Sequence, residues 1–171
     1  MTWNPLVSTI MEMPGVSKIY DSADIPGEII DLMVVNTETL ADNPAFGKAL
    51  VGAWYEAMQV MSSDTPAGIA ARESMAAASG TDLAGYDAQL TTTQMFYQPA
   101  DAVAFTQDAK LIQTMDFVRK FLFEHGILGE GAQSVDDIGI AFPGGKSLGD
   151  KGNITFRFDP AYMQMAADGA L

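Results

Sequence analysis

His125 is the side chain in this sequence that is best suited to acid–base chemistry, because an imidazole changes its charge near neutral pH. It is the only histidine, and it stands directly before Gly126, where a helix is expected to end. A cation in a last helical turn complements the helix dipole and hydrogen-bonds a free carbonyl. A general base would also need a nucleophile or carboxylate beside it, and the sequence alone shows none. The spacing therefore predicts that His125 caps a helix.

The sequence offers no pattern that is typical of a metal site. It contains no cysteine, which excludes disulfides, thiolate nucleophiles and Cys-ligated zinc, and one histidine cannot supply the several ligands that zinc needs. The acidic pairs Asp21/Asp24 and Asp136-Asp137 lack the spaced oxygen ligands and the fixed glycine of a calcium loop. We interpret them as solvated turns, and we expect no catalytic residue, no metal and no cofactor.

Residues 144–147 (GGKS) resemble the end of a phosphate-binding loop. The required glycine five residues before Gly145 would fall on Ile140, and residues 149–152 (GDKG) replace the helix that should receive the phosphate. We expect a flexible surface loop here instead.

Composition limits the classes of protein to which the chain can belong. The chain has 171 residues, 48% of them hydrophobic, which is enough for one globular core. Nine basic and 22 acidic residues give a net charge of -13, which excludes nucleic acid as a partner because phosphate binding needs a concentrated basic face. The acidity favours solubility, with a docking surface for a basic partner as the alternative. The N-terminus lacks the features of a signal peptide, and no apolar run approaches the ~20 residues of a membrane helix.

Helix-start signals recur through the middle of the chain. Asn43 before Pro44 is an N-cap followed by proline at the first helical position, and Thr65 before Pro66 repeats this arrangement. Three helices are therefore expected, over about 44–62, 66–78 and 82–90. The first carries an apolar stripe of Phe46, Leu50, Trp54, Ala57, Met58 and Met61. Trp54 lies at the centre of this stripe and is expected to be buried.

Another amphipathic helix is expected over 107–125, capped by Thr106 or Asp108 and closed by Gly126. Its apolar face consists of Leu111, Ile112, Met115, Val118 and Leu122. Before it, the β-branched and aromatic residues 91–97 favour an extended backbone, and residues 100–105 favour a short helical turn.

The C-terminal segment 131–171 is rich in glycine. Ile154, Phe156 and Phe158 alternate with polar residues, which predicts a half-buried strand, and Asp159-Pro160 predicts a last helix to about residue 167. So few apolar residues could not hold a core alone, so we interpret this segment as an extension of the preceding domain.

The N-terminal segment contains a helix start at Trp3-Asn4-Pro5 and an apolar run, Ile29–Val35, that predicts a buried strand. This order of elements resembles the second half of the solute-binding proteins of nitrate/sulfonate/taurine-type ABC importers, over roughly residues 1–130. Residues 25–32, 99–105 and 156–160 are also similar to stretches in the urea- and guanidine-associated branch of that family.

The resemblance implies an α/β fold, namely the C-terminal part of a two-lobed, type II periplasmic-binding-protein-like fold, mostly helical in this chain with few strands. Residues 1–35 would then be the remainder of the second lobe with the strand that crosses between the lobes. Residues 36–130 would be the helical C-terminal part of the first lobe, and residues 131–171 a loop-rich extension. The chain is accordingly expected to be a fragment of a longer parent.

The implied function is the binding of a small polar solute, of the urea, guanidine, nitrate, sulfonate or taurine class, and its delivery to the membrane permease of an ABC importer. The full-length parent would be periplasmic, and the fragment's exposed apolar surface would favour self-association. Hinge residues would be Asn36 and Thr37. The implied ligand-binding residues are Trp3, Asn4, Thr93, Phe96 and Tyr97.

Other interpretations of the sequence remain open. Trp3 is alternatively a core residue beside a helix start, and residues 93–97 alternatively serve packing. The helices over 44–62 and 107–125 are also compatible with a stand-alone helical interaction module that binds no solute. A small hydrolase or isomerase would need two carboxylates with displaced pKa values in one pocket, which sequence alone does not locate.

Overall fold

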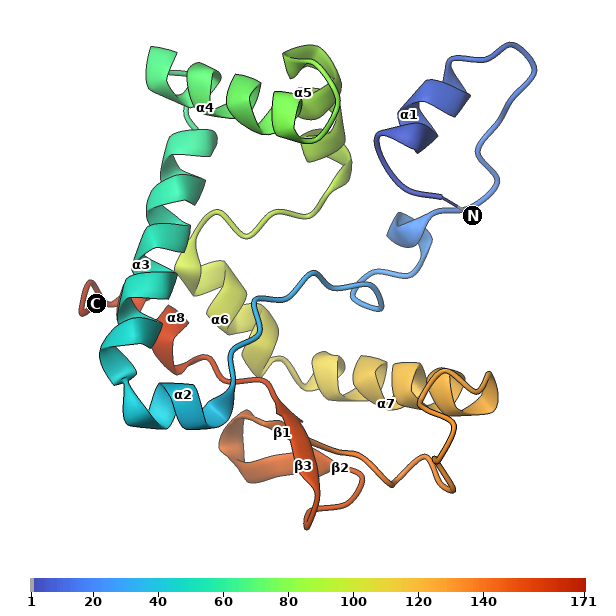
Figure 1. Cartoon of the computed structure of the whole chain (residues 1–171), viewed down its shortest axis with the longest axis vertical. Coiled ribbons are helices and arrows are strands. Elements are labelled where there is room, and N and C mark those ends of the chain that lie inside the picture. Colours follow the sequence, from blue (N-terminus) through green and yellow to red (C-terminus); the bar gives the residue numbers. More distant parts are fainter. Residues whose placement is uncertain (1) are drawn as a thin grey trace. The chain divides into compact units, whose positions relative to one another are not determined.

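The computed structural model describes residues 2–171 as a mixed α/β structure that is mostly helical and contains one small sheet (Figure 1). Its helices are α1 (Leu6–Met11), α2 (Thr37–Asp42), α3 (Pro44–Met61), α4 (Pro66–Ala78), α5 (Leu83–Thr92), α6 (Pro99–Gln107), α7 (Ala109–Glu124) and α8 (Ala161–Ala167). The strands are β1 (Gly139–Phe142), β2 (Lys146–Leu148) and β3 (Ile154–Arg157), and two short 3-10 helices are η1 (Ser22–Asp24) and η2 (Pro143–Gly145).

The chain divides into two compact units. The first unit comprises the residues up to Ile25 together with Ala53–Tyr97, and the second comprises Pro26–Gly52 together with Gln98–Leu171. The first half of α3 therefore belongs to the second unit and its second half to the first. The segment 131–171, interpreted above as an extension, lies wholly within the second unit.

In the first unit, α4 and α5 begin where the capping residues predict. Thr65 accepts a hydrogen bond at 3.2 Å from the backbone N–H of Gly68, and Asp82 accepts one at 2.8 Å from Gly85. After α4 the chain turns at Gly80, whose φ of 74° is a left-handed conformation that glycine adopts without strain. The prediction for α4 is confirmed, and that for α5 is confirmed except at its end: α5 runs to Thr92, so residues 91 and 92 are helical rather than extended as predicted.

The core of the second unit consists of Leu111 from α7, Phe142 from β1 and Phe158, which directly follows β3. The rings of Phe142 and Phe158 stack with centroids 5.3 Å apart. The sheet has the order β2-β1-β3, with β1 antiparallel to β2 and parallel to β3. The segment 131–171 therefore contributes two of the three buried residues of this core. Its few apolar side chains are part of the core rather than of the surface.

The predicted helix over 107–125 and the strand at Ile154 are confirmed. Asp108 caps α7 by accepting a hydrogen bond from Lys110 at 2.9 Å, and Gly126 ends it with a φ of 68°. The loop predicted at residues 144–147 is wrong: η2 and β2 occupy these positions, with β1 and β2 forming a hairpin. Sequence patterning missed β1 and β2 because their sequences, GIAF and KSL, do not alternate between apolar and polar residues.

The strand predicted at Ile29–Val35 is not formed. Residues 30–36 have no regular secondary structure, and Ile29 and Val34 are 69% and 68% exposed. An apolar run becomes a strand only when another strand accepts its backbone hydrogen bonds, and none of the three described strands does so. The run ends at Asn36, whose side chain caps α2.

The burial predicted for Trp54 is also wrong, since its side chain is 47% exposed. Phe46, at the start of the same stripe, is 41% exposed, whereas Met58 and Met61 are buried. Helical periodicity indicates which residues share a face, but it does not establish that another element covers the whole length of that face.

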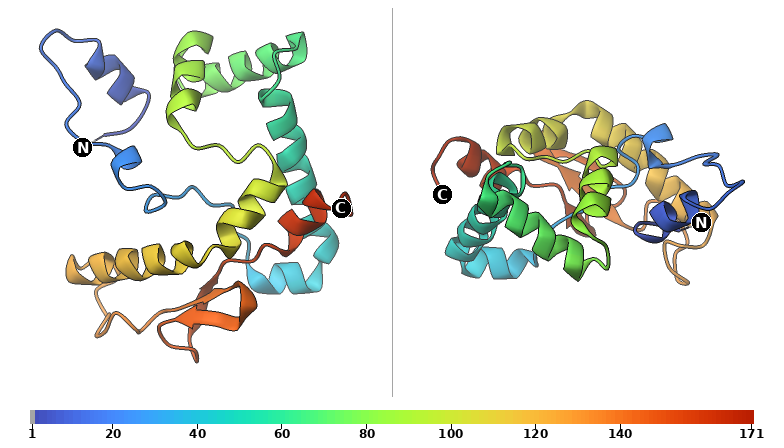
Figure 2. Two further views of the ribbon diagram at one scale, coloured as in Figure 1. Left: turned by 180° about the vertical axis from the view of Figure 1, so that it is seen from behind. Right: turned by 90° about the horizontal axis from the view of Figure 1, so that it is seen from above.

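The helix α8 packs beside the N-terminal half of α3 within the second unit (Figure 2). A Cβ atom added at Gly47 would lie 2.4 Å from Cζ of Tyr162, so only glycine permits this approach. The Lys48 ammonium also donates a hydrogen bond to the carbonyl oxygen of Ala170 at 3.1 Å. The C-terminal helix is therefore held against α3 by close packing and by one charged hydrogen bond.

We predict opposite effects for alanine at two glycines of α3. Gly47→Ala should lower the free energy of unfolding by about 1–3 kcal/mol, because its methyl group overpacks against Tyr162. Gly52→Ala should raise it by about 0.5–1 kcal/mol, because its Cβ would lie 3.7 Å from Leu171 and alanine favours the helix. Urea unfolding of both variants tests this. Equal stabilisation by both substitutions would contradict the tight contact at Gly47.

Candidate functional site

Trp3 and Asn4 lie at the start of α1 in the first unit. The carbonyl of Trp3 accepts a hydrogen bond from the N–H of Val7 at 3.2 Å, and Asn4 Oδ1 accepts one from the Ser8 hydroxyl at 2.9 Å. The helix start predicted at Trp3-Asn4-Pro5 is confirmed. The Trp3 side chain is 77% exposed, so the alternative interpretation of Trp3 as a core residue is wrong.

Thr93, Phe96 and Tyr97 follow α5 in the same unit. Thr93 is the C-cap of α5, with its hydroxyl donating to the Gln89 carbonyl at 3.0 Å, and the backbone from Thr93 onward is extended as predicted. Phe96 and Tyr97 are half-buried. All five predicted ligand-binding residues thus belong to the first unit. Two of them precede α1 and three follow α5. A ligand cleft shared by these two segments stays a prediction.

The predicted hinge residues Asn36 and Thr37 lie at the start of α2 in the second unit. Asn36 Oδ1 accepts hydrogen bonds from the N–H groups of Glu38 and Thr39, at 2.8 and 3.1 Å. Thr37 Oγ1 accepts one from Arg157 at 3.4 Å. The chain passes between the units at 25–26, 52–53 and 97–98 instead, so a hinge role at residues 36–37 stays a prediction.

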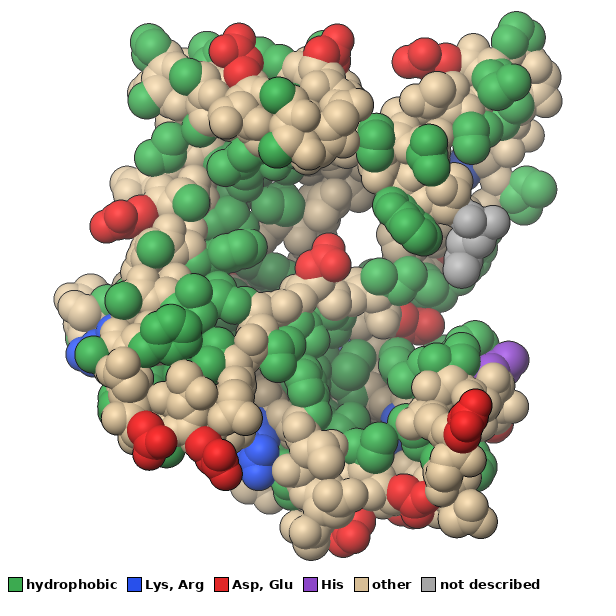
Figure 3. Space-filling view, viewed as in Figure 1, with side chains coloured by type: hydrophobic (Ala, Val, Ile, Leu, Met, Phe, Trp, Pro, Cys, Tyr) green, Lys and Arg blue, Asp and Glu red, His purple; other side chains and the backbone are tan. Residues whose placement is uncertain are grey.

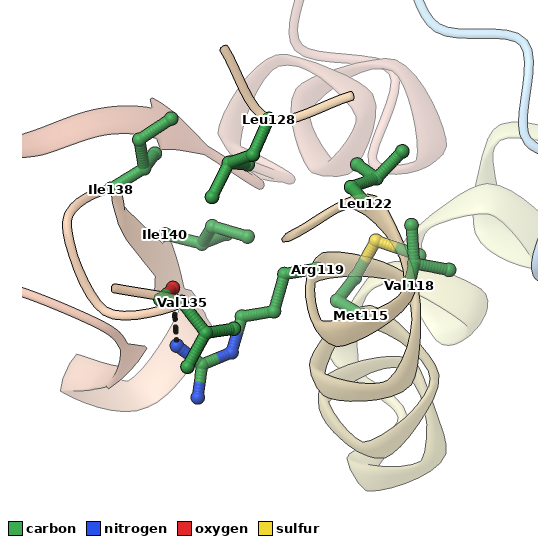
Figure 4. Close-up of a pocket in the computed structure, with 8 residues that line it drawn as sticks. All are labelled: Met115, Val118, Arg119, Leu122, Leu128, Val135, Ile138 and Ile140. Carbon is green, nitrogen blue, oxygen red and sulfur yellow. Dashed lines mark hydrogen bonds between the residues drawn. The ribbon is translucent and has the colours of Figure 1, made fainter. Parts of the chain in front are cut away.

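A cavity of about 160 Å³ lies in the second unit between α7 and the residues that lead into β1 (Figure 4). One wall is the face of α7 that carries Met115, Val118 and Leu122. The remaining lining residues are Arg119, Leu128, Val135, Ile138 and Ile140. All of them except Arg119 are apolar, so the cavity could accept only a small apolar group.

The charge of Arg119 beside this cavity is fully paired. Its guanidinium contacts Asp116 at 2.7 Å and Asp136 at 2.5 Å, and it donates a hydrogen bond to the carbonyl of Val135 at 3.1 Å. Burial lowers the pKa of Arg119, but the hydrogen bonds to Asp136 and Asp116 outweigh it and raise the pKa overall. Asp136 lies in an exposed turn, as predicted, and its carboxylate is also part of an ion-paired cluster with Arg119.

This cavity does not have the character of a ligand site. Sites for small molecules usually measure about 300–1,000 Å³ and combine apolar walls with a few polar groups that are open to the ligand. Here the volume is smaller, and the one cation already binds two carboxylates. We conclude that the cavity is a packing gap of the second unit.

A second buried cation, Arg72 of α4, holds the first unit together. Its Nε donates to Asp87 of α5 at 2.9 Å, and its Nη1 donates to the carbonyls of Met61 and Ser63 at 2.9 and 2.8 Å. Asp64 lies 3.6 Å from Nη2 but is fully exposed and contributes little. One planar guanidinium therefore joins the end of α3, the following loop and α5.

Sequence reasoning missed both arginine clusters. For the Arg119 cluster the sequence held a usable signal, because Asp116, Arg119 and Lys120 are spaced i, i+3 and i+4 on one helix. Arg72 gave only the signal of a lone cation in an alanine-rich helix, because its partners come from other elements. His125, by contrast, lies as predicted: Nδ1 is 2.9 Å from the carbonyl oxygen of Phe121, and its ring stacks on that of Phe121.

The acidic pairs form turns. Asp21 and Asp24 make the reciprocal hydrogen bonds of a capping box around η1, and Asp137 accepts two backbone N–H groups from residues 133 and 134. Within residues 2–171, no group of three or more His, Asp or Glu side chains could hold a metal ion. In the same range, no helix has both the length and the apolar character to cross a membrane.

Comparisons of this chain with protein-family models, with curated proteins and with solved structures found no match.

We predict that Arg72→Met lowers the free energy of unfolding of the first unit by about 2–4 kcal/mol, because it leaves two carbonyls and a carboxylate without their donor. Arg72→Lys should recover little, since an ammonium cannot reach all three acceptors in one plane. Hydrogen exchange of α4 and α5 measures the loss. The control is Asp64→Asn, which should change stability by less than about 0.5 kcal/mol; equal effects of the two changes would contradict this role.

We also predict an acid-sensitive contribution from Asp116. Hydrogen bonds from Lys120 and then Arg119 hold the pKa of Asp116 below its ordinary value of 3.8. A depressed pKa in the folded state adds stability above that ordinary value, and this stability is lost as the pH falls through the folded-state pKa. The stability difference between wild type and Asp116→Asn should therefore shrink below about pH 4. Urea unfolding across pH tests this, and a difference that is independent of pH would contradict it.

Proposed function

We propose that this chain is part of the substrate-binding component of an ABC importer, and that the complete protein binds a small polar solute of the urea, guanidine, nitrate, sulfonate or taurine class. In this proposal the chain supplies the C-terminal part of a two-lobed, type II periplasmic-binding-protein-like fold. Its partners are the solute and a membrane permease. The proposal derives from the family resemblance of the sequence, and the structure supplies one supporting observation.

That observation is the state of the apolar segment Ile29–Val35. It has the composition of a strand buried on both faces, yet it forms no strand and its side chains at positions 29, 32, 33 and 34 are exposed. Such a segment is expected when its sheet neighbours belong to another part of the protein. In a two-lobed parent, strands from outside this chain would pair with it and cover both of its faces.

The chemistry at the start of α1 suits a small polar ligand. The Trp3 ring is largely exposed and offers an aromatic face for a compact organic group. Asn4 uses its carbonyl oxygen to accept from Ser8, which leaves its amide N–H groups as donors to a solute oxygen. This side of the proposed site would therefore favour solutes that carry a hydrogen-bond acceptor.

The alternative function, a helical interaction module without ligand-binding activity, has one observation in its favour. Arg72 joins α4 to the end of α3 and to α5. The Tyr86 hydroxyl of α5 also contacts the sulfur atoms of Met61 and Met75, at 3.7 and 3.5 Å. A unit with its own internal contacts needs no second lobe. Apolar side chains also lie on the visible surface of both units (Figure 3), as a docking module would require.

The test begins with the coding sequence upstream of Met1. We expect it to encode an in-frame signal peptide and a half rich in βα units. We further expect this chain alone to bind urea, guanidinium, taurine or nitrate no better than about millimolar, because one wall of the site cannot enclose the solute. Co-expression with the upstream half should raise the affinity for one of these solutes, measured by titration calorimetry. An unrelated upstream gene would contradict the expected longer parent. Micromolar binding by this chain alone would likewise overturn the fragment part of the proposal, while supporting its solute-binding part. Absence of binding to all four solutes in the co-expressed protein would overturn the solute-binding part.

In the co-expressed protein, Trp3→Ala should weaken binding by about 1–3 kcal/mol with little loss of thermal stability, because an exposed ring is removed from the ligand site. Trp54→Ala is the matched control: it removes the other tryptophan of the chain and should leave the affinity unchanged. Equal losses of affinity in the two variants would show that Trp3 has no specific role in the site.

A further inference from the structure

The described residues of the first unit offer no unpaired Lys or Arg side chain to an anionic solute. The two basic residues in 2–25 and 53–97 are Lys18 and Arg72. Lys18 forms an ion pair with Asp21, and the nearly buried Arg72 donates to Asp87 and to two backbone carbonyls. Eight acidic residues lie in the same ranges, namely Glu12, Asp21, Asp24, Glu56, Asp64, Glu73, Asp82 and Asp87. An anion bound to this unit would therefore meet an excess of negative charge.

The side chains proposed to contact the solute are themselves uncharged: Trp3, Asn4, Thr93, Phe96 and Tyr97. The largely exposed Trp3 ring has an electron-rich face, which stacks on planar groups and attracts cations rather than anions. Asn4 Nδ2 hydrogen-bonds to no other described residue and is left as a donor to the solute. One neutral amide does not replace the hydration that an anion would lose on binding.

We propose that this part of the site selects a planar, nitrogen-rich solute that is uncharged or cationic, such as urea or guanidinium, and rejects nitrate, sulfonates and the sulfonate end of taurine. The inference rests on the proposed function, because it narrows the solute class of that same site. It is drawn from the distribution of charge in the first unit and not from the family resemblance. Nitrate and urea make the sharpest comparison, since both are small and planar and only nitrate is an anion.

Salt distinguishes the two accepted solutes from one another. Guanidinium is attracted by the negative charge of the first unit, and added salt screens this attraction. Its dissociation constant should therefore rise with the concentration of sodium chloride. Urea carries no charge, so its dissociation constant should not depend on salt. The two responses separate recognition of a cation from recognition of an uncharged planar molecule.

NMR titration of the intact chain tests the selection. The indole N–H signal of Trp3, with that of Trp54 as the internal reference, should shift with urea and with guanidinium chloride at up to about 50 mM, far below denaturing concentrations. Sodium nitrate and taurine should shift it no more than sodium chloride does, which places their dissociation constants at least about tenfold above that of urea. A Trp3 signal that responds to neither urea nor guanidinium, or nitrate binding as tight as that of urea, would overturn this inference. The proposed function is judged separately, by whether the co-expressed protein binds any of the four solutes.

A cation added beside Trp3 and Asn4 tests the cause of the selection. Leu6 is the first residue of α1 and is 58% exposed, so Leu6→Lys adds a charge without disturbing a core. It should strengthen nitrate binding about tenfold and leave urea binding unchanged, because only the anion gains from the new charge. Ile127→Lys, at a residue of the second unit that is 62% exposed, makes the same change in net charge and is the matched control. Nitrate binding that is unchanged in Leu6→Lys, or that gains equally in Ile127→Lys, would overturn the inference.

Discussion

The stacking of Phe142 on Phe158, together with burial of Leu111, is the contact on which the second unit depends. A sheet of three strands, each three or four residues long, is not stable in water unless a helix covers its apolar face. The helix α7 provides that cover, and its own apolar face would otherwise be open to solvent. Sheet and helix are therefore stable only together, which makes the glycine-rich C-terminal segment essential to this unit rather than an addition to it.

Cations are scarce in this acidic chain, and two of the nine serve as internal ties. Arg72 and Arg119 are each nearly buried, and each binds both a carboxylate and a backbone carbonyl. A guanidinium suits this task because its planar donors reach several acceptors at once. Both therefore join a helix to a neighbouring loop, one in each unit, and the charge they bring is compensated locally. The remaining surface is left strongly acidic, which disfavours polyanionic partners such as nucleic acid.

One physical fact underlies the proposed function, namely that the Ile29–Val35 segment leaves apolar side chains exposed. A parent with further strands would cover these side chains within one protein.

The sequence by itself determined the helices, because capping is local: Asn43 before Pro44, Asp108 and Gly126 each act on the backbone within a few residues. The tertiary structure decided the rest. Whether Ile29–Val35 pairs, and whether Trp54 is covered, depends on elements distant in sequence, and periodicity identifies a face without identifying its neighbour. For the same reason the sequence indicated that a helix begins at Trp3, but it did not indicate which residues or ligand the exposed Trp3 ring would contact.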